Sequence, residues 1–72
     1  MTTLEKLKFC KEHGISISYI ASRANVVPAT LTRWMRGEKG MSKKNEEIIA
    51  IILLQIAHEI WEGLSDYNDG NL

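Results

Sequence analysis

The most regular pattern of apolar and polar positions lies in the second half of the chain. Between Asn45 and Gly63 there is neither Gly nor Pro, and apolar residues recur there at the spacing of three or four that a helix requires. These residues are Ile49, Ile52, Leu53, Ile56, Ile60 and Leu64. The pattern predicts one long helix that follows Ser42, with a break near 55–58 as an alternative.

The apolar surface of this helix is wider than a single stripe, because twelve of residues 48–64 are apolar. Either the core encloses the helix on most sides, or part of its surface meets another chain. We favour contact with another chain, for which a homodimer through the C-terminal helix is one arrangement. The candidate residues are Ile48, Ile51, Leu54, Ile60 and Trp61. Trp61 fits either a core position or an interface.

Three shorter helices are predicted earlier in the chain from residues that begin and end helices. Thr2 or Thr3 caps the first helix, Ser16 caps the second, and Pro28 suits the first turn of the third. Gly14 ends the first helix. The predicted helices span residues 3–13, 17–23 and 28–37, and a loop follows at 38–41. The whole domain is predicted to span residues 1–64, with a flexible acidic tail at 65–72.

The segment 17–37, ISYIASRANVVPATLTRWMRG, has the pattern of a helix-turn-helix. Two short helices cross at a steep angle only if their seam is small and apolar, and Ala21 occupies the closest approach. Asn25 falls in the turn, where a positive φ is required and Asn is tolerated better than any residue except Gly. The seam residues are Ile20, Ala21, Ala24, Val26, Leu31 and Trp34.

Length and composition indicate one small soluble domain. The chain has 72 residues and a single cysteine, Cys10, which fits a reducing cytoplasm better than a disulfide-stabilised secreted domain. The N-terminus is too charged for a signal peptide. The longest unbroken apolar run, 48–54, is seven residues, whereas a membrane span needs about 20. We therefore expect a cytoplasmic protein without a membrane partner.

The net charge of zero hides a strong separation of charge along the chain. Residues 1–45 hold all nine Lys and Arg and three acidic residues, a net +6, whereas residues 46–72 hold six acidic residues and no Lys or Arg, a net −6. The positive half coincides with the helix-turn-helix pattern, which favours contact with phosphate groups. An accidental distribution of surface charge is the alternative.

Residues 3–60 resemble the Cro/C1-type, or xenobiotic-response-element, helix-turn-helix family. The likeness rests on the seam, on Asn25, and on the segment LTRWMRGEKGMS that closes the third helix. It implies an all-α, compact bundle of four to five helices with a central helix-turn-helix and a long apolar C-terminal helix. It also implies that the second helix of the motif enters the major groove of operator DNA.

The chain departs from this family where base contacts are usually made. Family members often carry Gln at the start of the second helix and paired Ser or Gln at the start of the third, where this chain has Ile17, Val27 and Pro28. Val27, Pro28 and Ala29 offer no side-chain donor or acceptor, and we expect them to be exposed and to bind a protein. The remaining candidate DNA-binding residues are Ser16, Thr30, Thr32, Arg33, Arg36, Lys39, Lys43 and Lys44.

A second departure concerns a charged pair. The family frequently pairs an Arg on the first helix with a Glu near the end of the third, and the corresponding residues here are Cys10 and Met35. Replacing both charges with apolar groups is often neutral for stability, whereas removing one charge is costly. The chain therefore predicts an apolar contact between Cys10 and Met35.

Two functions from different classes follow from these features. One is a transcription regulator of a phage-type genetic switch that binds operator DNA, a cognate repressor, or both through its helix-turn-helix. The alternative is an antirepressor that blocks the DNA-binding surface of a partner repressor, and in size and pattern the chain is similar to small temperate-phage modulators of repression. Cys10 and His13 are spaced as two ligands of one metal ion can be, but the sequence offers no further ligands for such a site. We expect no enzymatic activity, metal, cofactor or small-molecule ligand.

Overall fold

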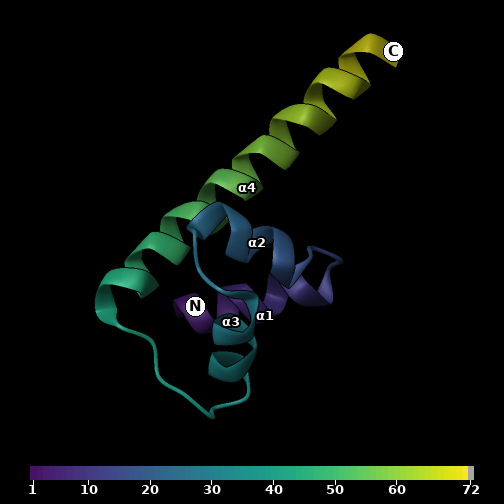
Figure 1. Ribbon diagram of the computed structural model, residues 1–72. Helices are drawn as coiled ribbons and strands as arrows, with labels where there is room; N and C mark the ends of the chain where they lie inside the picture. Colours follow the sequence, from purple (N-terminus) through teal and green to yellow (C-terminus); the bar gives the residue numbers. More distant parts are fainter. Residues whose placement is uncertain (72) are drawn as a thin grey trace.

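The computed structural model describes the backbone of residues 1–71 and the side chains of residues 1–65. Its helices are α1 (Thr3–Glu12), α2 (Ile17–Ala24), α3 (Pro28–Met35) and α4 (Lys43–Asn71). Figure 1 shows α1 to α3 gathered against the N-terminal half of α4, while the C-terminal half of α4 projects from this body. The described backbone contains these four helices and no strand, so the all-α prediction is confirmed.

The first two helices begin at the predicted capping residues. Thr2 Oγ1 accepts a hydrogen bond from the backbone N–H of Glu5 at 3.1 Å, and Glu5 Oε1 accepts one from the N–H of Thr2 at 2.8 Å. This reciprocal pair of hydrogen bonds is a capping box, and it shows that Thr2, and not Thr3, is the N-cap residue of α1. Ser16 Oγ accepts from the N–H of Tyr19 at 3.2 Å. Gly14 follows α1 with φ +88°, which a glycine adopts without strain.

The turn between α2 and α3 has the predicted left-handed residue. Asn25 has φ 56° and ψ 43°, and the N–H of Val26 donates to the carbonyl of Ala21 at 2.9 Å. The Ala21 carbonyl also accepts from the N–H of Asn25, so two backbone donors close the end of α2 on it. Ala21 is fully buried in the core that α2 and α3 share, so the predicted geometry of the turn is confirmed.

One apolar core joins all four helices. Leu7 comes from α1, Ile20 from α2, Leu31 from α3 and Ile49 from α4, and each is fully buried. No polar or charged side chain is buried among residues 1–65. The complete set of buried residues is Leu7, Ile20, Ala21, Ala24, Leu31, Trp34, Ile49, Leu53 and Ile56. Of the predicted seam, Val26 is half-buried at the edge of this core and the other five residues lie inside it.

The long helix differs from its prediction at its end. It begins after Ser42, whose Oγ accepts from the N–H of Asn45 at 3.2 Å, and it continues without the alternative break at 55–58. It extends to Asn71 and so includes residues 65–71 of the segment that was predicted as a tail. A glycine costs a helix only about 1 kcal/mol and no proline follows it, so Gly63 alone does not end α4. Mobility of the predicted tail stays a prediction, because the side chains of 66–71 and all of Leu72 lie outside the described residues.

An ion pair fixes α2 against the middle of α4. The Arg23 guanidinium donates to both carboxylate oxygens of Glu59, with Nη1–Oε1 at 2.6 Å and Nη2–Oε2 at 2.8 Å, and also contacts the Tyr19 hydroxyl at 3.1 Å. The hydrogen bonds from Arg23 hold the pKa of the Glu59 carboxyl below its ordinary value. Arg23 is therefore engaged within the chain and is not a free cation.

The segment Lys43–Ser65 of α4 is long and apolar enough, by length and composition, to cross a membrane. Only 17% of its most apolar 18-residue window is buried, although Ile49, Leu53 and Ile56 pack in the core. The absence of a membrane partner therefore stays a prediction.

Candidate functional site

The N-terminus of α3 presents an exposed apolar surface. Val27, Pro28 and Ala29, which we call the apolar tip, are all exposed, and Val27 keeps 65% of its surface accessible. Val27 is the N-cap residue of α3 and makes no side-chain capping bond. The predicted exposure of the tip is confirmed, and its role in binding stays a prediction.

The hydroxyl groups near the tip are poorly placed for contacts with bases. Thr32 Oγ1 donates to the Pro28 carbonyl of its own helix at 3.3 Å, and Ser16 Oγ caps α2. Thr30 is half-buried. Two of the three candidate hydroxyls are thus engaged within the chain, which leaves arginines as the main polar groups on the exposed face of α3.

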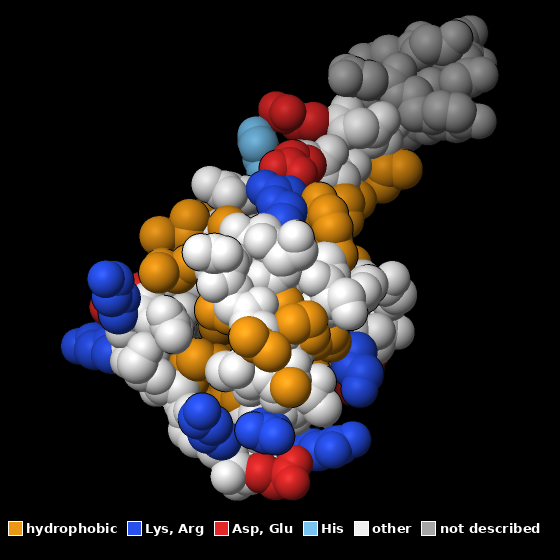
Figure 2. Space-filling view, viewed as in Figure 1, with side chains coloured by type: hydrophobic (Ala, Val, Ile, Leu, Met, Phe, Trp, Pro, Cys, Tyr) orange, Lys and Arg blue, Asp and Glu red, His pale blue; other side chains and the backbone are white. Residues whose placement is uncertain are grey.

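The predicted cations surround this face. Figure 2 shows Lys and Arg side chains around the end of the body that carries α3 and the following loop, with hydrophobic side chains between them. Arg36 lies 3.8 Å from Glu38, and both side chains are largely exposed, so this pair leaves Arg36 accessible. We call the five exposed predicted cations the basic patch: Arg33, Arg36, Lys39, Lys43 and Lys44.

Two further cations extend the positive surface onto α1, and the sequence did not single them out. Lys8 and Lys11 line a hollow of about 380 Å³ together with Thr32, Met35, Arg36 and one acidic residue, Glu12. Their spacing of three places them on one face of α1. That spacing was visible in the sequence, but the position of this face beside α3 depends on how the helices pack.

The predicted contact between Cys10 and Met35 stays a prediction. Both side chains are partly buried against the core. They line different hollows, Cys10 the groove between α1 and α4, and Met35 the hollow that contains Lys8 and Lys11. Burial raises the pKa of the Cys10 thiol, which makes it a weak nucleophile at neutral pH.

A second apolar surface lies along α4. Trp61 is 69% exposed and Leu54 is 72% exposed, so a core position for Trp61 is excluded. Ile51 and Ile60 are also exposed, whereas Ile48 is half-buried against the core and cannot offer a full side chain to a partner. This difference depends on which side of α4 packs against the core, which the sequence pattern alone does not determine.

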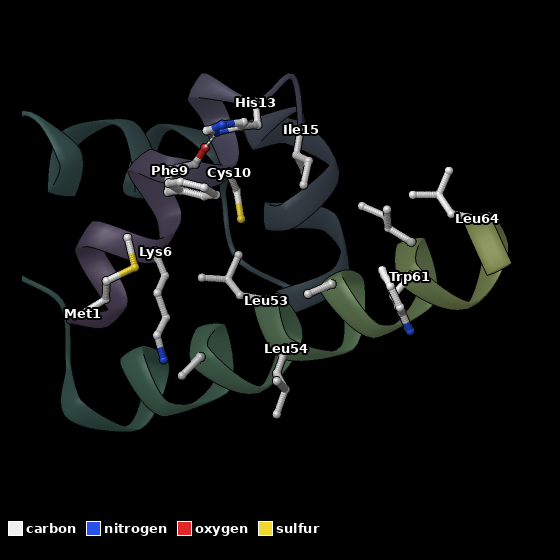
Figure 3. A pocket seen from close by; sticks show the side chains of 13 residues that line it. Met1, Lys6, Phe9, Cys10, His13, Ile15, Leu53, Leu54, Trp61 and Leu64 are labelled. Carbon is white, nitrogen blue, oxygen red and sulfur yellow. Dashed lines mark hydrogen bonds between the residues drawn. The ribbon is translucent and has the colours of Figure 1, made fainter.

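An apolar groove of about 410 Å³ runs between α1 and this surface. Figure 3 shows Met1, Phe9 and Cys10 on the α1 side, and Leu53, Leu54, Trp61 and Leu64 on the α4 side. Lys6 is the only Lys, Arg, Asp or Glu among the residues that line it. His13 also lines the groove, where its ring stacks on Phe9 at 4.0 Å and its Nδ1 donates to the Phe9 carbonyl at 2.8 Å.

No metal-like cluster occurs among the residues whose side chains are described. In that part of the chain no three His, Cys, Asp or Glu side chains come together in a way that could hold an ion. His58 pairs instead with Glu62, at 3.0 Å, on the exposed side of α4. The candidate surfaces are therefore two, the apolar tip with the basic patch, and the groove between α1 and α4.

Comparisons of the chain with protein-family models, with curated proteins and with solved structures give no match.

Proposed function

We propose that this protein is a small helix-turn-helix regulator of a phage-type genetic switch that acts by docking the apolar tip of α3 on a partner repressor. The observation that carries this proposal is the exposure of Val27, Pro28 and Ala29 at the N-terminus of α3. In a DNA-reading helix-turn-helix this end contacts base edges, yet these three side chains have no hydrogen-bonding group.

The polar surroundings of the tip support the same proposal. Sequence-specific contact with base edges needs directed donors and acceptors, and the hydroxyls of Ser16 and Thr32 are engaged inside the chain. Phosphate contacts from the remaining lysines and arginines carry no sequence information, and Arg33 and Arg36 are left as the main groups on the exposed face of α3 that can read a base edge. A regulator with such a surface obtains its specificity from a protein partner. The resulting function is that of an antirepressor, which shields the DNA-binding surface of its partner.

Val27→Asp is a sharp test, because the structure predicts that the variant folds. Val27 is an N-cap without a capping bond, and Asp is among the preferred N-cap residues and suits the positive end of the helix dipole. We therefore expect an unchanged or raised melting temperature. Docking of an unpaired carboxylate in an apolar interface is unfavourable, so partner binding should be lost.

The matched control is Ser22→Asp, which adds the same charge to an exposed position on α2. The wild type and both variants are used as bait in an extract of the native host, and a recovered repressor is then tested for operator binding in a gel-shift assay. The proposal requires that wild type and Ser22→Asp recover the repressor and release it from DNA, while Val27→Asp does neither. Equal recovery by Val27→Asp, or a collapse of its fold, would overturn it.

Direct binding of operator DNA is the second candidate, and the positive surface favours it. The basic patch lies beside α3, and Lys8 and Lys11 extend it onto α1. In this case the purified protein alone shifts its operator, Arg33→Ala with Arg36→Ala abolishes the shift, and Val27→Asp leaves partner recovery unchanged. The two candidates therefore differ in which variant loses activity.

A further inference from the structure

The outer side of α4 carries a second apolar stripe beside the one that packs into the core. Its members alternate at intervals of four and three residues, which is the spacing of a coiled-coil seam. The stripe consists of Ala50, Leu54, Ala57, Trp61 and Leu64. The core stripe of α4 is formed by Ile49, Leu53 and Ile56, all buried, so the second stripe is not needed for the packing of α1 to α3.

This stripe is largely uncovered within the chain. The C-terminal half of α4 projects beyond the other helices (Figure 1), and Figure 2 shows hydrophobic side chains on one side of the projecting part and acidic and His side chains on the opposite side. The large exposed side chains along the groove are Met1, Phe9, Leu54, Ile60, Trp61 and Leu64. Together they expose at most roughly 800 Å², which is of the order of the area that one partner buries in a stable interface.

The charges around the stripe favour a second copy of this chain in the opposite direction. Residues 46–72 hold six acidic residues and no Lys or Arg, whereas residues 1–45 carry a net charge of +6. Two antiparallel α4 helices bring the acidic C-terminal half of each copy beside the basic N-terminal body of the other, whereas a parallel pair would bring the two acidic halves together. Lys6 is the single Lys, Arg or acidic residue in the groove lining, and its ammonium suits the acidic end of the partner helix. The net charge of zero means that two copies do not repel each other overall.

We propose that this protein forms a twofold homodimer in which the groove between α1 and α4 of each copy receives the projecting half of the other copy's α4, with the two α4 helices antiparallel. Small Ala50 and Ala57 alternate with large Leu54 and Trp61 along the stripe. With Ala50 of one copy opposite Leu64 of the other, the two Ala57 residues meet at the twofold axis, where small side chains let the helices approach closely, and Leu54 of each copy packs against Trp61 of the other. The proposal does not depend on the function of the apolar tip.

Leu54→Glu tests the dimer, with Gln55→Glu as the matched control. Leu54 is 72% exposed, so the change leaves the core intact, and Gln55 lies at the adjacent position beside Arg23. In sedimentation equilibrium the wild-type mass should rise with concentration from 8.2 kDa toward twice that value. Leu54→Glu should raise the dimer Kd about 30-fold or more, the effect typical of a central interface residue. Gln55→Glu should change it less than about threefold.

The two tryptophans give an independent signal of dimer formation. Trp34 is 8% exposed and Trp61 is 69% exposed, so a change in emission on association reports mainly on Trp61. The wild-type emission maximum should shift to shorter wavelength as concentration rises, and that of Leu54→Glu should not. Val27→Asp should dimerise like the wild type, which separates failure of this interface from failure of the tip.

Crosslinking tests the direction of the helices. Ala50→Cys and Leu64→Cys are made separately in a Cys10→Ser background and mixed under mild oxidation. An antiparallel pair gives the mixed disulfide, because the two ends of the stripe meet across the twofold axis. Preferential formation of the Ala50→Cys homodimer would show a parallel pair and overturn the proposed arrangement.

Three further results would overturn the proposal. One is a single-chain mass at about 1 mM chain, where even a weak specific dimer is populated. Another is a shift of Trp61 emission on vesicles of phosphatidylcholine and phosphatidylglycerol by a protein that stays monomeric in their absence, which would assign the stripe to a lipid surface. The third is a monomer whose capture of a partner repressor is abolished by Leu54→Glu and not by Gln55→Glu, which would assign the groove to that repressor.

Discussion

Asn25→Val is the most direct perturbation of the turn that positions α3. Asn25 has a left-handed backbone, with φ 56° and ψ 43°, and it is the only residue other than glycine with a positive φ in the described part of the chain. The next N–H, that of Val26, closes the end of α2 on the Ala21 carbonyl at 2.9 Å. A change in the backbone at Asn25 therefore alters both the end of α2 and the direction of α3.

The magnitude follows from the backbone conformation. A left-handed conformation costs an L-residue about 1–2 kcal/mol, and a β-branched residue pays more than Asn does. We expect Asn25→Val to lower the free energy of unfolding by about 1–3 kcal/mol, and Asn25→Gly to change it by less than about 0.5 kcal/mol. For a domain of this size each 1 kcal/mol shifts the melting temperature by roughly 4–8 °C. A total stability of about 4–10 kcal/mol keeps the Asn25→Val variant folded and measurable.

Thermal and urea unfolding followed by circular dichroism at 222 nm measure this difference. Ser22→Val is the control, because Ser22 is exposed on α2 in an ordinary helical conformation, and it corrects for the general effect of a β-branched residue. Equal stability of the Asn25→Val and Asn25→Gly variants would refute the left-handed turn. If the turn has the described geometry, Asn25→Val should also bind the proposed partner repressor more weakly than the wild type does, when the two are compared at the same concentration of folded protein. The reason is that the apolar tip moves with α3.

Three other measurements test separate parts of the structure. If the basic patch binds DNA through four to five phosphates, the slope of log K against log salt concentration is roughly −4, and a slope near zero in a gel-shift series contradicts this. Cys10→Arg should cost about 1–3 kcal/mol, because an unpaired charge then meets a half-buried site, and Met35→Glu should restore part of it; additive losses would show that the two residues are not neighbours. Arg23 lowers the pKa of Glu59, so this pair stabilises the fold above the ordinary carboxyl pKa of 4.5 and the contribution disappears as pH falls through the lowered folded value. The stability difference between wild type and Glu59→Gln should therefore shrink between neutral pH and about pH 3, and a constant difference in urea unfolding would exclude the ion pair.

Local signals explain the parts of the fold that the sequence predicts well. Thr2, Ser16 and Asn25 act on backbone groups within three or four residues of themselves, so their effects do not depend on the rest of the chain. The buried seam is predictable for a related reason. Ile20 and Ala24 lie four positions apart on α2, and Leu31 and Trp34 lie three apart on α3, so each short helix turns one apolar face to the core.

The remaining features depend on contacts between distant residues or on the absence of a stop signal. Arg23 and Glu59 are 36 positions apart, and nothing near either residue indicates the other. Lys8 lies beside Arg36 only because α1 packs next to α3. The helix α4 continues through residues 65–71 of the predicted tail, because Gly63 weakens a helix without ending it unless the backbone turns left-handed, as it does at Gly37 with φ +74°.

The apolar tip and the groove between α1 and α4 lie on different parts of the molecule, so separate substitutions can test them. The ion pair of Arg23 and Glu59 occupies one polar side of α4 and holds α2 there. The groove on another side of the same helix is lined by residues 1–15 and by α4, without a residue of α2 or α3. A change at Leu54 can therefore alter association through α4 without moving α3, and a change at Val27 can alter the tip without moving α4. If two copies associate through the grooves, each dimer carries two tips, and a dimeric repressor that engages both gains affinity from the second, intramolecular contact. Loss of dimer formation in Leu54→Glu should then weaken binding to a dimeric repressor more than binding to its isolated DNA-binding domain, whereas Val27→Asp should abolish both.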